Sequence, residues 1–157
     1  MSRMPFKIEH RIGVQRPAEQ VWAAIYDLQA WKDWNPMYPE AVGKLLISAP
    51  LTLTEKVDGH SETYQAVVAD WVPHAQIVWT RASFGGLLRH IRYLEIEKLS
   101  EEGCIFSNGE LYQGLLAELL VPKGRRRKLR RAFAALGEAV KARTEAGHGE
   151  DTEAWRG

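Results

Sequence analysis

The stretch FSNGELYQGLLAELLVPKGRRRKLRRAFAALGEAV, residues 106–140, contains the change of pattern that decides the fold. Its first part alternates between two faces, as a β-strand does, and one face holds Phe106, Asn108, Glu110 and Tyr112. Its last part repeats its apolar residues at spacings of four, three and four, which is a helical period: Leu129, Phe133, Leu136 and Val140. The stretch therefore predicts a strand followed by a long C-terminal helix, with a kink or restart near Pro122.

The residues before this stretch predict a sheet with two short helices near its start. Apolar residues alternate from Phe6 to Val14, as in a half-buried strand, and Pro17 suits the first turn of an amphipathic helix. A second short helix must end near Asn35, because a residue before proline disfavours the α region. Beyond Pro39, turn signals separate about six strand-length pieces. Asp58-Gly59 among them is a strong hairpin signal.

Composition fits one ordinary domain with a conventional core. The chain has 157 residues, 45% of them apolar and 26% charged, so we expect a single domain over 1–146 and a flexible polar tail over 147–157. The net charge of +1 gives no global field toward nucleic acid, and we predict no specific nucleic-acid partner. The single cysteine, Cys104, excludes an internal disulfide, and the scattered histidines leave no metal-ligand spacing. We therefore predict no metal and no cofactor.

The first residues and the apolar runs of the chain bear on its cellular location. The first six residues lack the apolar segment of a secretory signal. No apolar run approaches the roughly 20 residues that span a bilayer. We accordingly expect a cytoplasmic protein, either a monomer or a homodimer.

Four motifs stand in the order and spacing of a known superfamily. They are RPAEQVW at 16–22, WNP at 34–36, IVW at 77–79 and NGELYQGLL at 108–116. With these motifs and the order of its elements, the sequence from about Phe6 to Ala146 resembles the polyketide cyclase/dehydrase-like branch of the START/Bet v 1-like (SRPBCC) superfamily. The resemblance implies an α+β helix-grip fold, in which a curved antiparallel sheet of about seven strands wraps around a long C-terminal helix. It also implies an elongated apolar cavity between sheet and helix, but no particular ligand.

The resemblance places the Arg92 face of its strand toward this cavity. A buried guanidinium needs a carboxylate or an anionic or carbonyl group of a ligand, and Glu110 on the next strand is the natural partner. The alternative is a local break in alternation that leaves Arg92 in solvent. We expect the ligand to contact apolar walls, for which core packing is the alternative role, and a polar end. The predicted binding residues are Trp34, Trp79, Arg92, Leu94, Phe106, Asn108, Glu110, Tyr112 and Phe133.

Two residues are candidates for catalysis. Glu110 has the chemistry of a general acid or base, with a structural link to Arg92 as the alternative. His10 lies on the apolar face of the first strand, where a hydrogen-bonded core histidine is the common outcome. His90 shares the parity of Arg92, and we expect it near the rim of the cavity. No nucleophile–base pair can be read from the sequence.

Three functions fit these patterns. The first is binding or transport of a small hydrophobic ligand that is lipid-, polyketide-, quinone- or aromatic-like. The second is a cyclase or dehydratase that uses Glu110 as acid or base. The third is a membrane-associated lipid carrier or chaperone that docks through the basic cluster Lys123–Arg131, with weak contact to anionic membranes through Arg125, Arg126, Arg127 and Arg130. A solvated helix face is the other interpretation of this cluster. We expect binding rather than catalysis.

Overall fold

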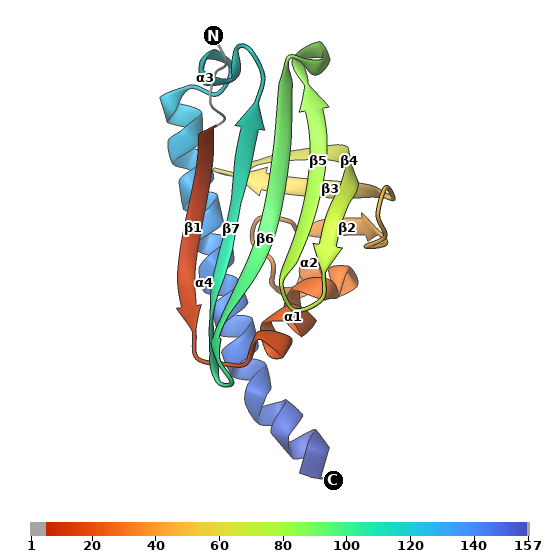
Figure 1. Ribbon diagram of the computed structural model, residues 1–157, viewed down its shortest axis with the longest axis vertical. Coiled ribbons are helices and arrows are strands. Elements are labelled where there is room, and N and C mark those ends of the chain that lie inside the picture. Colours follow the sequence, from red (N-terminus) through yellow and green to blue (C-terminus); the bar gives the residue numbers. More distant parts are fainter. Residues whose placement is uncertain (1–5, 157) are drawn as a thin grey trace.

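A curved sheet and one long helix make up most of the protein (Figure 1). The computed structural model describes the backbone of residues 6–156 and the side-chain surroundings of residues 6–146. The strands are β1 (Phe6–Val14), β2 (Glu40–Gly43), β3 (Pro50–Val57), β4 (His60–Val72), β5 (Gln76–Ser83), β6 (Leu88–Ser100) and β7 (Gly103–Gln113). The helices are α1 (Ala18–Tyr26), η1 (Leu28–Ala30), α2 (Trp31–Trp34), η2 (Phe84–Gly86), α3 (Ala117–Leu120) and α4 (Lys123–Arg156). The predicted α+β helix-grip arrangement is confirmed.

The sheet has the strand order β1-β7-β6-β5-β4-β3-β2, and every pair is antiparallel. It bends strongly, so that β2 and β3 cross the direction of β1 and β7 (Figure 1). A register shift between Val68 and Asp70 lies on β4, where the sheet turns from one direction to the other. Such irregularities bend a strand and increase its twist. The bend gives the sheet a concave face.

The β3–β4 hairpin is the one that Asp58-Gly59 predicts. Val57 pairs with His60, so only these two residues form the turn. Both have positive φ, 52° at Asp58 and 81° at Gly59, as a two-residue turn with the twist of the strands requires. The hairpin therefore forms where the local sequence specifies it.

Helix α4 covers the concave face of the sheet. Its apolar stripe of Leu129, Phe133, Leu136 and Val140 is buried. The predicted restart near Pro122 is present, since α3 ends at Leu120 and α4 begins at Lys123. The helical backbone of α4 continues through residues 147–156, and the expected mobility of 147–157 stays a prediction.

Gly137 lets α4 approach β1 closely. A Cβ atom at this position would lie 2.6 Å from Nδ1 of His10. The imidazole thus fills the space that a side chain on α4 would need. Within the part of the chain that the structure describes, no helix is long and apolar enough to cross a bilayer.

Candidate functional site

Apart from Trp34 on α2, the predicted binding residues gather between the sheet and α4. All of them except the half-buried Trp34 are buried. Those on strands belong to β5, β6 and β7, and Phe133 faces them from α4. Strand alternation places them there, because every second residue of each strand points to the concave face.

Arg92 lies at the centre of this face and is 2% exposed. Its Nη1 donates a 2.5 Å bond to Oε1 of Glu55, and Nε and Nη2 contact Oε2 of Glu110. Nη1 also donates to the hydroxyl oxygen of Tyr38. The guanidinium is therefore paired inside the protein with two carboxylates, as its burial requires. The alternative in which Arg92 faces solvent is wrong.

The buried Arg92, Glu55 and Glu110 form a charge cluster, and a tight corner of the chain brings Tyr38 to it. Oδ1 of the buried Asn35 accepts bonds from the backbone N–H groups of Met37, at 3.0 Å, and Tyr38, at 2.8 Å. Pro36, between Asn35 and Met37, suits the turn, because its φ is fixed and it has no N–H to satisfy. The WNP motif thus fixes the backbone that delivers the Tyr38 ring to the interior.

Glu110 is held as a carboxylate. Burial by itself raises the pKa of this group, but the charge of Arg92 and the hydrogen bond of His90 outweigh burial and lower the pKa to about 2. Nδ1 of His90 lies 2.8 Å from Oε1 of Glu110, and Nε2 of His90 lies 2.7 Å from Oγ of Ser83. A chain of polar groups therefore runs from Arg92 to the end of β5.

The tyrosines around the cluster are neutral. Burial raises the pKa of Tyr38, Tyr64 and Tyr112, and it outweighs the opposing effect of Arg92. Tyr64 donates a 3.3 Å hydrogen bond to Oε1 of Glu55. Their hydroxyls thus offer hydrogen bonds without adding charge.

His10 lies away from the imidazole that bonds Glu110. It pairs across the sheet with Asn108, and its ring packs against Gly137 on α4. The histidine that contacts Glu110 is His90, which is 8% exposed. The geometry therefore joins Glu110 to His90 instead of His10.

Several buried polar atoms on this face lack a hydrogen-bond partner among the described residues. They include Nε1 of Trp79, Oδ1 of Asn108 and Nδ1 of His10, which packs against Gly137. The other end of the Asn108 amide donates a 3.0 Å bond to the backbone oxygen of Phe133. Buried polar groups are usually satisfied, so such atoms mark places where a ligand or a water molecule would gain a bond.

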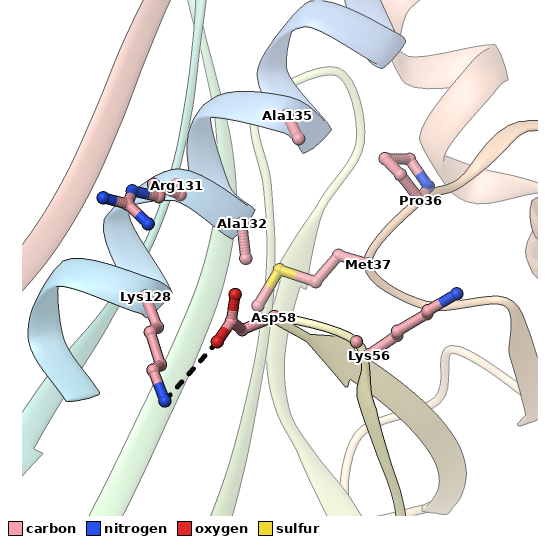
Figure 2. A pocket seen from close by; sticks show the side chains of 9 residues that line it. Pro36, Met37, Lys56, Asp58, Lys128, Arg131, Ala132 and Ala135 are labelled. Atoms are coloured by element: carbon pink, nitrogen blue, oxygen red, sulfur yellow. Dashed lines mark ion pairs between the residues drawn. The ribbon is translucent and has the colours of Figure 1, made fainter. Parts of the chain in front are cut away.

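A groove of about 390 Å³ opens between α4 and the β3–β4 hairpin. Figure 2 shows Met37 facing Ala132 and Ala135 of α4 across it, with Lys128 and Asp58 joined at one side. Nζ of Lys128 lies 3.4 Å from Oδ2 of Asp58. The buried Met37 lies on the floor of the groove and directly precedes Tyr38, which contacts the charge cluster.

The basic cluster at the start of α4 is partly committed to internal contacts. Arg126 donates to the backbone oxygens of Val121 and Glu118, and its guanidinium lies 4.2 Å from the ring centre of Phe6. Nη2 of Arg125 lies 3.8 Å from Oε2 of Glu55. Arg127 and Arg130 are exposed, and membrane contact through the cluster stays a prediction.

The residues of the site that the sequence analysis does not name include Glu55, Tyr38 and Ser83. Glu55 had a readable signal, because it interrupts the apolar face formed by Leu51, Leu53 and Val57. Tyr38 and Ser83 had none, since one follows an irregular corner and the other is a common strand-end residue.

The fold is that of the START/Bet v 1-like class. Solved structures of this class share its fold. The Zhui aromatase/cyclase from Streptomyces sp. R1128 has 17% identity and a TM-score of 0.71, over 92% of this chain and 96% of that one. A START superfamily protein from Mycobacterium smegmatis has 18% identity and a TM-score of 0.68, over 89% and 97%. Norcoclaurine synthase from Thalictrum flavum has 11% identity and a TM-score of 0.68, over 94% and 99%.

The family model for polyketide cyclase / dehydrase and lipid transport matches residues 5–141, and the chain belongs to that family. No curated protein matches the sequence. The family supports a ligand-binding or cyclase role without selecting one of them.

Proposed function

We propose that this protein binds a small, largely apolar molecule that enters at the groove between α4 and the β3–β4 hairpin. The groove carries the proposal, because apolar side chains line it and one of them, Met37, is the neighbour in the chain of Tyr38, which contacts Arg92. Met37, Ala132 and Ala135 supply apolar contacts, and Tyr38 beside Met37 contacts Arg92. Pockets of this make-up, apolar with a few convergent polar groups, are typical of small-molecule sites.

The rim of the groove favours a ligand with a negative or carbonyl end. Lys56, Lys128 and Arg131 line it together with one acid, Asp58. Asp58 is already paired with Lys128. The remaining cations leave a net positive rim, and such a rim attracts anionic groups.

The cyclase alternative has less support from the geometry of Glu110. A general base works best with a pKa near the operating pH, and the pKa of Glu110 is about 2. Both of its oxygens already accept bonds from Arg92 and His90. A carboxylate held in this way stabilises and orients its neighbours more readily than it takes up a proton.

The first experiment is native mass spectrometry of freshly purified protein, compared with the same sample after denaturing extraction. We expect an apolar molecule of defined mass to leave with denaturation. The second is titration with an apolar fluorescent probe such as 1-anilinonaphthalene-8-sulfonate.

A matched pair of variants on α4 makes the titration specific. Ala135→Trp fills the groove, whereas Ala142→Trp places the same side chain on an exposed position of the same helix. We expect Ala135→Trp to weaken probe binding by at least about tenfold, or about 1.4 kcal/mol, and Ala142→Trp to leave it unchanged. Equal binding by both variants would reject the groove as the site.

A further inference from the structure

Three side chains at one end of the concave face form a hydrogen-bonded chain. Oγ of Ser83 lies 2.7 Å from Nε2 of His90, and Nδ1 of His90 lies 2.8 Å from Oε1 of Glu110. An ionised carboxylate only accepts hydrogen bonds, so Nδ1 of His90 carries the hydrogen that Glu110 receives. In the neutral ring Nε2 is then the acceptor, and the Ser83 hydroxyl donates to it. This is the proton arrangement that activates a serine for nucleophilic attack.

The backbone after Ser83 turns sharply. Ser83 is the last residue of β5, and φ is 54° at Phe84, 65° at Gly85 and 94° at Gly86. A bulky residue with positive φ is rare and costs free energy, and such residues cluster at functional sites. The turn also sets the N–H of Phe84 directly after the serine. In hydrolases with a nucleophile at a strand-to-helix turn, the N–H of the following residue stabilises the oxyanion.

An apolar surface surrounds the chain at this end. Phe84 is 57% exposed and Leu87 is 48% exposed, while Leu115, which follows β7, and Leu119 of α3 are each 73% exposed. The two segments touch, because a Cβ atom on Gly114 would lie 2.1 Å from the backbone oxygen of Leu87. The strands β5 and β7 both end at the top of Figure 1, with the start of β6 between them and α3 beside the end of β7. A partly exposed serine therefore lies beside apolar side chains.

We propose that Ser83, His90 and Glu110 hydrolyse carboxylic esters with an apolar acyl chain. Oγ of Ser83 bonds to the carbonyl carbon while its proton moves to Nε2 of His90. The bond from that carbon to the alcohol oxygen breaks, and the alcohol leaves with the proton from His90. Water then attacks the acyl group, gives a proton to His90, and releases the acid as that proton returns to Oγ of Ser83.

Glu110 is the positioning residue of this chain. It holds the His90 ring by Nδ1 and faces the imidazolium that forms after proton transfer. Arg92 fixes Glu110 from the other side. This site lies at the end of the β5–β6 hairpin, whereas the groove lies at the β3–β4 hairpin, so different residues line the two sites. Arg92 contacts both, through Glu110 here and through Tyr38 beside the groove.

The experiment measures covalent labelling and turnover on the full-length protein. A fluorophosphonate probe should label one serine, and peptide mapping should find the label on Ser83. Turnover is followed with p-nitrophenyl esters of increasing acyl length. We expect Ser83→Ala and His90→Gln each to lower kcat/KM by at least about 100-fold. Ser61→Ala, an exposed serine on β4, is the matched control and should keep full activity.

Two results would overturn the proposal. One is turnover that persists in Ser83→Ala, since a base acting directly on water would explain it without a nucleophile. The other is the lack of any label on Ser83 together with turnover no faster than that of the unfolded protein. Thermal unfolding of each variant shows whether the fold is kept, and His90→Gln leaves the Arg92–Glu110 pair in place if Ser83→Ala proves unstable.

Discussion

Arg92 on β6 and Glu55 on β3 form a 2.5 Å ion pair inside the protein, although β5 and β4 lie between their strands in the sheet. The bend of the sheet brings the two side chains together across its concave face. Both are 2% exposed, so neither charge has water to stabilise it. The pair depends on Glu110 as well, which contacts the other side of the guanidinium.

We expect Arg92→Met to lower the free energy of unfolding by roughly 3–5 kcal/mol, because it leaves two buried carboxylates without their cation. Urea unfolding followed by far-UV circular dichroism measures this change. Arg11→Met is the matched control: its ion pair with Glu97 is exposed at 53% and 61%, and we expect a loss below about 1 kcal/mol.

Neutralising the whole cluster should reverse most of that loss. In the triple variant Glu55→Gln, Arg92→Met and Glu110→Gln no buried charge is left unpaired. An Arg92→Met variant as stable as the wild type would contradict the role of the cluster.

The pKa of Glu110 gives a stability change at acidic pH. The pKa is about 2 in the folded protein and 4.5 ordinarily, so the unfolded chain binds the proton more readily. The contribution of Glu110 is therefore present above about pH 4.5 and lost as pH falls toward about 2. Its size is of the order of 3 kcal/mol.

Urea unfolding at a series of pH values tests this. We expect Glu110→Gln to flatten the fall in stability over that window, while the exposed control Glu102→Gln follows the wild type. Parallel curves for Glu110→Gln and the wild type would show that Glu110 titrates normally.

The effect of Gly137→Ala on stability should change sign when His10 is replaced by alanine. Alanine in place of glycine ordinarily stabilises a helix interior by up to about 1 kcal/mol. Here the added Cβ would lie 2.6 Å from Nδ1 of His10, so we expect Gly137→Ala to destabilise the wild-type protein. In a His10→Ala background the same change should be stabilising. A double-mutant cycle on chemical unfolding measures this, and additive effects would show that the imidazole does not occupy the space.

Strand periodicity carried the sequence-based prediction furthest. Alternation alone placed Arg92 and Glu110 on one face of neighbouring strands, and the structure pairs them directly in the register of β6 and β7. The helical period of the C-terminal stretch likewise matches the buried stripe of α4. These predictions succeeded because each depends on local geometry.

The rest of the site depends on curvature, which no local pattern encodes. Glu55 stands out on its own strand, but its contact with Arg92 arises only once the sheet bends across two intervening strands. His90 was expected near the rim of the cavity. Its hydrogen bonds to Ser83 and Glu110 could not be predicted, because the three residues lie on three different strands. The groove also escaped prediction, since it joins residues of α4 to a hairpin formed far earlier in the chain.

The buried contact of Glu55 ties the outer part of the sheet to its centre. If β2 and β3 detached while the other strands stayed folded, Arg92 would lose one carboxylate and Tyr38 would lose the strand beside it. Such an opening therefore costs a large share of the free energy of global unfolding. The amides in the middle of β3 should then exchange with deuterium as slowly as those of β6, even though only the four-residue β2 separates β3 from the edge of the sheet.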